Sequence, residues 1–203
     1  MEQLRHLYVP LNFNVKFKFD GLSTLETLGG FDTESCDVND LCKLINLRQL
    51  EDANFWKMHN QDLAAFINYL SIGADHLRQT SLSVQFCKNE EEELTLLKQL
   101  LGCHHLYRLN IYGIIPELRE YCQGLFPNLI ELTLVRCNLE EDPMPTLERL
   151  PNLQYLDLVV NIEKHQKKNG KWKKKILEDK KGKAAPEVCV SLGWGGVGWG
   201  VTF

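Results

Sequence analysis

The 203-residue chain is long enough for one domain or one repeat array, and its 44% of hydrophobic residues can supply a continuous core. It has no apolar run of about 18 residues that would span a membrane. Residues Met1–Pro10 also lack the basic-then-apolar layout of a secretory signal, so we expect a cytoplasmic protein. The net charge of −4 is unevenly distributed: residues 163–183 have a charge of +7, and the rest of the chain has a charge of −11. Because most of the chain is acidic, a typical nucleic-acid-binding protein is excluded.

Seven cysteines are consistent with an intracellular location. Their number is odd and no two are spaced as C-x-x-C, which argues against a disulfide framework and against a zinc or redox pair. We therefore expect reduced and mostly buried thiols, no metal and no cofactor. The cysteines are Cys36, Cys42, Cys87, Cys103, Cys122, Cys137 and Cys189.

Leucines recur along the first half of the chain in irregular units. Candidate units of the form L-x-x-L begin at Leu4, Leu22, Leu47 and Leu77. The second unit has a looser spacing, and the third has Asp52 where an aliphatic residue is expected. The fourth has Thr80 at its middle core position, so its register could slip.

Three clearer units follow at Leu106, Leu129 and Leu153, and Leu129–Leu139 matches L-x-x-L-x-L-x-x-N/C-x-L at every fixed position. Alternate residues of a strand face the same way, so the last two leucines of each unit point into a core together. A unit cannot bury this face alone, and the next unit covers it. At the Asn/Cys position, Cys137 and Asn161 are expected to satisfy backbone groups where the chain leaves each strand.

Two of the intervals between the starts of successive units are long enough to contain a helix. The segment 60–70 places Leu63, Phe66, Ile67 and Leu70 on one apolar stripe. The segment 89–102 begins with a potential capping Asn, continues with an acidic run suited to a helix N-terminus, and ends at a Gly. We interpret that acidic run as a first helical turn and not as a metal site.

These patterns predict an α/β fold: a leucine-rich-repeat solenoid, a horseshoe arc with short parallel strands on the concave face and helices or irregular loops on the convex face. We expect about six to seven repeats in residues 1–162. Residues 163–203, rich in Lys and then in Gly and Trp, resemble a tail without regular structure. A nuclear-localisation or membrane-surface role for the lysines is the alternative, and localisation could thus include the nucleus.

Residues Phe126–Leu158, FPNLIELTLVRCNLEEDPMPTLERLPNLQYLDL, resemble the repeat region of plant coiled-coil nucleotide-binding leucine-rich-repeat disease-resistance proteins. Gly21–Leu50 is similar to the same class, and the resemblance covers about residues 1–160. In that family the repeat region senses pathogen effectors or altered host proteins and holds the receptor inactive. The resemblance therefore implies a protein partner: an effector, a guarded host protein or the receptor's nucleotide-binding domain.

The chain departs from that family because it contains no G-x-x-x-x-G-K-[ST] phosphate loop and no coiled-coil segment. We therefore do not carry nucleotide binding over. Nothing indicates an enzyme either: His104 and His105 are adjacent, and adjacent residues of a strand face opposite sides. Cys103 and His104 lack a third group that would orient a base.

The variable positions of each strand would line the concave face, and Tyr and Arg are the residue types that dominate binding hot spots. The predicted protein-binding residues are Arg48, Gln49, Glu51, Arg78, Gln79, Tyr107, Arg108, Asn110, Tyr112, Glu131, Thr133, Arg136, Tyr155 and Asp157. The alternative is a truncated structural or regulatory repeat fragment without a ligand of its own. In that case the core edge near Leu156 and Leu158 would be left uncapped and could self-associate. The oligomeric state stays open.

Overall fold

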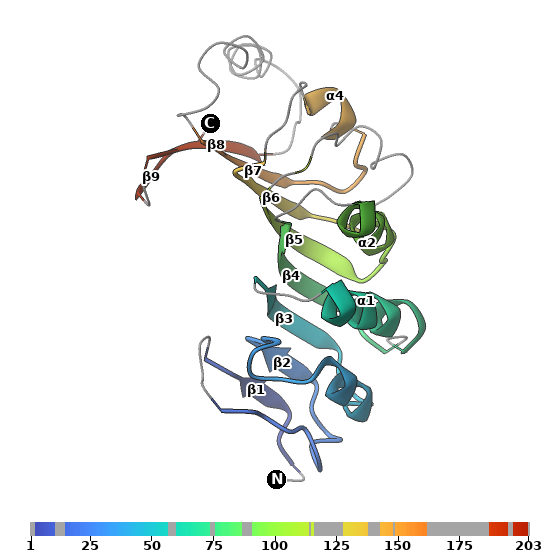
Figure 1. The fold of residues 1–203 in the computed structure, drawn as a ribbon. Coiled ribbons are helices and arrows are strands. Elements are labelled where there is room, and N and C mark those ends of the chain that lie inside the picture. Colours follow the sequence, from blue (N-terminus) through green and yellow to red (C-terminus); the bar gives the residue numbers. More distant parts are fainter. Residues whose placement is uncertain are drawn as a thin grey trace.

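A computed structural model of the chain provides the fold (Figure 1). It describes residues 3–10, 15–56, 60–73, 76–86, 91–113, 115, 128–137, 143–147, 149–161, 187–194 and 197–202. The statements below concern these residues. The lysine-rich stretch 164–183, the capping residue predicted at position 89, the first residue of the acidic run at position 90, and Leu139 lie outside them.

One sheet runs the length of the described chain, and its strands follow one another in sequence order. The strands are β1 (His6–Tyr8), β2 (Thr27–Gly29), β3 (Gln49–Phe55), β4 (Gln79–Phe86), β5 (Leu106–Gly113), β6 (Glu131–Val135), β7 (Tyr155–Asn161), β8 (Glu187–Trp194) and β9 (Val197–Thr202). Strands β1 to β8 pair in parallel, and β9 is antiparallel to β8. Figure 1 shows them stacked in one column from the N-terminal to the C-terminal end.

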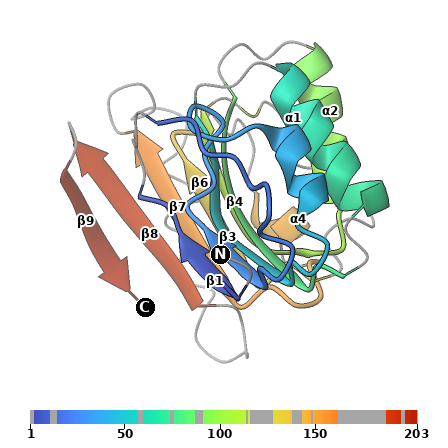
Figure 2. The same ribbon diagram turned by 90° about the horizontal axis from the view of Figure 1, so that it is seen from below.

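The helices lie on one side of this sheet, as the view along the column makes plain (Figure 2). They are the 3-10 helix η1 (Val38–Lys43), α1 (Asn60–Asn68), the π-helical turn η2 (Tyr69–Gly73), α2 (Glu91–Leu101) and the short α4 (Met144–Leu147). The two helices predicted from the sequence are confirmed as α1 and α2, and α1 buries Leu63, Phe66 and Ile67 as expected. The result is a parallel repeat sheet with helices on one face.

Two ladders of apolar residues, in register from strand to strand, form the centre of the core. The first ladder contains Ala53, Leu82, Leu109, Leu132 and Leu156. The second contains Phe55, Val84, Ile111, Leu134 and Leu158. All ten side chains are buried and belong to one hydrophobic cluster, so each unit covers the apolar face of its neighbour.

An aromatic cluster joins the helix layer to the sheet near the third unit. The ring of Phe55 in β3 lies 4.7 Å from that of Phe66 in α1, centroid to centroid. Phe31, which follows β2, lies 6.0 Å from Phe55 and 6.4 Å from Phe66. Because all three side chains are fully buried, the cluster fixes α1 against two neighbouring units.

The sequence assignment of the second unit is wrong by three residues. Leu28 pairs in register with Leu7 on one side and with Leu50 on the other, so it occupies the middle core position. The unit therefore begins at Leu25, which is also fully buried, and the first two steps of the repeat become 21 and 22 residues. Leu22 precedes the repeated part of the unit.

The irregular third and fourth units are explained by two β-bulges, one on each side of β4. In β3 the register shifts between Leu50 and Ala53, and Asp52 adopts a positive φ of 51°, which places Ala53 in the core instead. Between β4 and β5 the register shifts next to Thr80. This agrees with the prediction that the fourth unit could slip because it has Thr at its middle core position. Asp adopts left-handed backbone conformations more readily than most residues. Asp52, which seemed to interrupt the leucine pattern, therefore meets the backbone requirement of the bulge.

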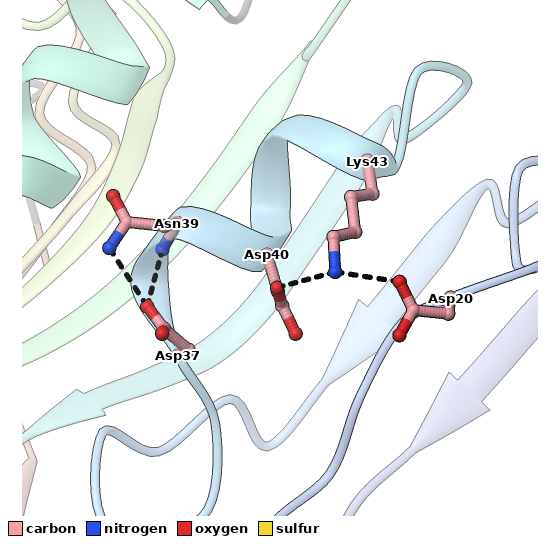
Figure 3. Close-up of polar contacts among 5 residues, drawn as sticks. All are labelled: Asp20, Asp37, Asn39, Asp40 and Lys43. Carbon is pink, nitrogen blue, oxygen red and sulfur yellow. Dashed lines mark hydrogen bonds and ion pairs between the residues drawn. The ribbon is translucent and has the colours of Figure 1, made fainter.

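The connection from β2 to β3 is held by polar contacts around η1 (Figure 3). Asp37 caps the helix by accepting hydrogen bonds from the backbone N–H and the side chain of Asn39, at 2.9 and 3.0 Å. The Lys43 ammonium group lies 2.6 Å from Asp20 and 2.8 Å from Asp40. Hydrogen bonding to Lys43 lowers the pKa of Asp20, so this exposed contact is present at neutral pH and is lost only in strong acid.

Strands β8 and β9 differ from the predicted tail without regular structure. Strand β8 pairs with β7 over seven positions, from Tyr155–Glu187 to Asn161–Gly193, and β9 folds back on it. The EVCVSL sequence alternates β-branched residues, and β7 offers an unpaired edge, so the two complement each other. Leu156 and Leu158, which the truncated-fragment alternative would leave partly exposed at an uncapped edge, are each 1% exposed.

We predict that Leu132→Ala lowers the free energy of unfolding by about 2–5 kcal/mol, because Leu132 is packed in the middle of the first ladder. Thr133→Ala, one residue further along β6 on the opposite face, should change it by less than about 0.5 kcal/mol. Urea unfolding followed by circular dichroism measures both. Equal effects of the two substitutions would place Leu132 outside the core.

A second prediction concerns the β8 edge. Because β8 lies between β7 and β9, proline at Val190 removes a ladder hydrogen bond on one side or the other, and we expect a stability loss of about 1–3 kcal/mol. The uncovered β7 edge should also promote self-association, measured as a higher molar mass by light scattering. Ser191→Thr is the control, since it retains the N–H and a high β-propensity. A proline variant that matches this control would contradict the pairing of β8 with β7.

Candidate protein-binding face

The side of β3 to β7 that faces away from the helices is the candidate binding surface, and we call it the open face. Side chains alternate along each strand, so residues between the core positions must point to this side. Eleven of the predicted site residues belong to these strands: Gln49, Glu51, Gln79, Tyr107, Arg108, Asn110, Tyr112, Glu131, Thr133, Tyr155 and Asp157. Each is exposed or half-buried.

Three predicted arginines lie beyond the strand ends. Arg48 and Arg78 are exposed in the turns that enter β3 and β4, and the backbone N–H of Arg78 donates to the carbonyl of Arg48 at 2.8 Å. Arg136 follows the last residue of β6 at a positive φ of 56°, with its N–H bonded to the Val159 carbonyl. The structure therefore separates these residues from the centre of the open face.

The two bulges concentrate side chains at the centre of the open face. Each bulged strand turns two consecutive residues outward, Glu51 and Asp52 in β3 and Tyr107 and Arg108 in β5. Between them β4 contributes only Ser81, whose buried hydroxyl donates to Asp52 Oδ1 at 3.3 Å. Four larger polar side chains thus surround one small residue. Bulges commonly aim side chains in this way next to functional sites.

Arg108 is not a free cation on this surface. It forms an ion pair with Glu131, its register partner on β6, and its guanidinium lies 5.7 Å from the centre of the Tyr107 ring. Hydrogen bonding to Glu131 raises the pKa of Arg108 further. Burial raises the pKa of Tyr107, which stays a neutral phenol at physiological pH. The open face therefore presents Arg108 already compensated by a carboxylate.

Two rows of polar side chains cross the strands on either side of the bulges. Towards the N-terminal strands, His6 Nδ1 lies 3.0 Å from Thr27 Oγ1, which donates to Gln49 Oε1 at 3.1 Å. Gln49 Nε2 in turn donates to Gln79 Oε1 at 3.4 Å. These partners hold the glutamines across the sheet. A second row, Ser83, Asn110, Thr133 and Asp157, continues in register through β4 to β7, with Asn110 donating to Ser83 at 3.1 Å.

Sequence reasoning missed Trp56, the largest side chain of the open face. Trp56 follows Phe55, which is in the core, so it projects to the opposite side and is 50% exposed. Its ring lies 5.1 Å from that of Tyr112, edge to face, although Trp56 follows β3, Tyr112 lies in β5, and β4 separates these two strands. The Trp56 N–H donates to Asn54 Oδ1 at 3.1 Å, which positions its backbone. Continuing the alternation of β3 by one residue would have identified it.

Cys137 has the structural role expected of the repeat position that it occupies. Its buried thiol contacts the carbonyls of Ile111 and Val135, each at 3.7 Å, where the chain leaves β6. Burial raises the pKa of this thiol to about 12. The expectation of reduced, buried cysteines is confirmed for Cys36, Cys103 and Cys137, whereas Cys42 is free but exposed.

Within the described ranges, no three His, Cys, Asp or Glu side chains are grouped so that they could hold a metal ion. No helix among those ranges has the length and apolarity needed to cross a membrane. The described part of the open face thus offers hydrogen-bonding, aromatic and carboxylate groups. Such groups are suited to recognising another molecule at a surface.

The fold and the open face together define a protein of parallel, stacked units with one polar and aromatic surface. No family model matches the chain. It is 31% identical over 161 residues to the putative disease resistance protein At1g58400 of Arabidopsis thaliana, a match of 78% of this chain and 17% of that protein. It is 32% identical to the probable disease resistance protein RF45 and 28% identical to the disease resistance protein RPP8 of the same plant, again over 78% of this chain.

The chain is therefore homologous to plant disease resistance proteins, and the resemblance inferred from the sequence is confirmed. It spans about one sixth of the length of the curated relatives that it matches: 17%, 15% and 17%. The role in disease resistance that these names state is that of the relatives. What the chain binds is a separate question.

We predict that the reactivity of the cysteine thiols follows how deeply they are buried. At pH 8, iodoacetamide should alkylate Cys42 in the folded protein at least about tenfold faster than Cys137, because the raised pKa leaves almost no Cys137 thiolate. Peptide mass spectrometry after timed quenching measures both sites. In 6 M guanidinium chloride, the unfolded control, the two rates should converge. Fast labelling of Cys137 in the native chain would contradict its contacts with Ile111 and Val135.

Proposed function

We propose that the chain is a protein-binding leucine-rich-repeat module, a solenoid whose concave side is the open face. The observation that carries this proposal is the register of the sheet. The same pairing that stacks Leu109, Leu132 and Leu156 in the core aligns Asn110, Thr133 and Asp157 in a row on the other side. A row of side chains on fixed strands is a preorganised surface, which reduces the entropy lost on binding.

Homology to disease resistance proteins supports a role in plant defence, with the chain sensing a pathogen effector or a host protein that an effector has altered. An autoinhibitory contact with a receptor's nucleotide-binding domain is the other role that we assign to this surface. The module acts by binding and not by catalysis, in the cytoplasm or the nucleus. No phosphate loop occurs in the chain, so nucleotide binding is not part of the proposal.

The alternative, a structural fragment without a ligand, predicts self-association through an uncapped C-terminal edge. Burial of Leu156 and Leu158 and the pairing of β7 with β8 favour the binding module instead. The open face also contains Trp56 and Tyr155, which are 50% and 47% exposed. Exposed aromatic side chains of this size are characteristic of surfaces that bind other proteins.

The test is partner capture with a blocked open face. Thr133 lies between Asn110 and Asp157 in the middle of the surface, so Thr133→Trp adds bulk there without altering charge or the core. We expect the full chain to capture plant proteins from leaf extract in quantitative mass spectrometry, and the Thr133→Trp variant to retain less than about one tenth of the specific ones, a loss typical of a central interface position.

The matched control is Gln61→Trp, which places the same large side chain on the exposed side of α1. This variant should capture the same proteins as the unmodified chain. If Thr133→Trp and Gln61→Trp capture equal amounts, binding does not use the open face and the proposed function fails. Thermal unfolding of both variants separates blocked binding from loss of the fold.

A further inference from the structure

The open face contains a row of apolar side chains near the carboxyl ends of its strands. Tyr112 in β5 pairs with Val135 in β6, and Val135 pairs with Val159 in β7, so the three residues lie side by side. Each is half-buried, and none belongs to the buried core cluster. Trp56, which follows β3, extends the row across β4, because its ring lies 5.1 Å from that of Tyr112. We call Trp56, Tyr112, Val135 and Val159 the apolar row.

A polar row runs beside the apolar row on the same face. Two residues earlier in the strands, Asn110, Thr133 and Asp157 are aligned with Ser83 by the same register. Two residues along a strand span about 7 Å, so the two rows cross the sheet next to each other. The open face therefore has an apolar stripe bordered by groups that can form hydrogen bonds. Such a surface complements an element with one apolar and one polar side.

The apolar row itself is uncharged, but an arginine lies at its outer border, where the strands end. Burial raises the pKa of Tyr112, so its phenol is neutral at physiological pH. Arg136 comes directly after Val135 and is exposed. Among the residues that the structure describes, its guanidinium takes part in none of the ion pairs. Arg136 is therefore available to a carboxylate from outside the described chain.

The other charged groups on the described part of the open face lie on the inner side of the apolar row, towards the ends at which the strands begin. Two arginines are in the turns that enter β3 and β4, and a third is compensated by the carboxylate of its register partner. A group at the outer border thus meets Arg136 before any of them. The inner charged residues are Arg48, Glu51, Asp52, Arg78, Arg108, Glu131 and Asp157.

The spacing of the apolar row favours a helix as its occupant. From β3 to β7 the row crosses four strand spacings of about 4.8 Å, or about 19 Å in all. One side of an α-helix repeats about every 5.4 Å, so four turns differ from the length of the row by about 2 Å. An extended chain running along the row repeats one side about every 6.7 Å and would be out of step by about 8 Å after four repeats.

We propose that the apolar row binds an amphipathic helix of a partner protein, with the apolar side of the helix packed along the row and an acidic side chain paired with Arg136. This inference rests on the proposed function and specifies its partner. Charge complementarity selects the acidic flank, because a basic side chain at the outer border would meet Arg136 with like charge. Trp56 anchors the helix, since half of its side chain is exposed while the contact with Tyr112 holds the ring in place.

The experiment measures fluorescence anisotropy of labelled peptides titrated with the full chain. The first peptide is alanine-based and about 16 residues long, with leucines along one side, two glutamates beside them, and hydrocarbon links on the far side that keep it helical. A second has the same composition with the leucines scattered around the helix, and a third lacks the links and has a central proline. We expect the first to bind at least about tenfold more tightly than either, because only it presents a continuous apolar side on a helix.

Paired variants locate the site. Trp56→Ala should weaken binding of the first peptide at least about fivefold, whereas Ile72→Ala, which removes a more exposed apolar side chain next to the helices, should leave it unchanged. Val159→Thr retains the size and β-propensity of the residue but adds a hydroxyl group to the apolar row, so it should weaken binding by about two- to fivefold. Thermal unfolding of each variant shows that the fold is retained.

Charge reversal tests the outer border. A fourth peptide has lysines in place of the two glutamates and should bind about three- to tenfold more weakly than the first. Arg136→Gln should remove this preference, and Arg136→Glu should reverse it. Arg48→Glu, which makes the same change at the opposite end of the strands, should retain the preference of the unmodified chain.

Equal binding of the first and second peptides, tighter binding of the proline peptide, or absence of binding by the first would each overturn the inference. Equal effects of Trp56→Ala and Ile72→Ala, or an unchanged charge preference in Arg136→Glu, would do the same. These results leave the proposed function intact if Thr133→Trp still abolishes partner capture. Conversely, if the first peptide binds at Trp56 but Thr133→Trp captures as much protein as Gln61→Trp, the helix site stands and the proposed function fails.

Discussion

The alternation of side chains along strands that share one register is the constraint on which the whole structure depends. Leu109, Leu132 and Leu156 occupy equivalent positions, so the outward neighbours Asn110 and Thr133 are equivalent as well. A slip of one residue would bury these polar groups and expose the leucines, at a cost that excludes the alternative register. The continuous core and the ordered surface are therefore two consequences of one pairing.

The later repeat units could be predicted because each is specified by residues that are close together in the sequence. From Leu106 onward, two residues separate the first pair of leucines and one separates the second pair, which determines both the strand and its buried side. The stripe of Leu63, Phe66 and Ile67 likewise determines α1 without reference to the rest of the chain. The open-face residues of β5 to β7 followed from the same alternation, with Arg136 after the end of β6 as the exception.

The features that the sequence did not predict depend on pairing between segments that are distant in the sequence. The start of the second unit at Leu25 becomes evident only when Leu28 is aligned with Leu50, 22 residues later. The contact of Trp56 with Tyr112 crosses an intervening strand, so it depends on the register of β3, β4 and β5. Strand β8 forms against an edge that β7 supplies, so its own composition was an incomplete guide.

The bulges have a functional consequence that regular strands could not produce. Strict alternation places one outward residue between two core residues, but a bulge turns two outward together, as with Glu51–Asp52 and Tyr107–Arg108. Charged and aromatic groups are therefore brought together next to the two register shifts beside β4. Ala53 and Leu109 keep the core continuous beneath these residues, so Glu51 and Tyr107 can change with little effect on the core, whereas Asp52 also has to adopt a positive φ. The register shifts that interrupt the ladder beside β4 thus also determine which side chains lie together on the open face.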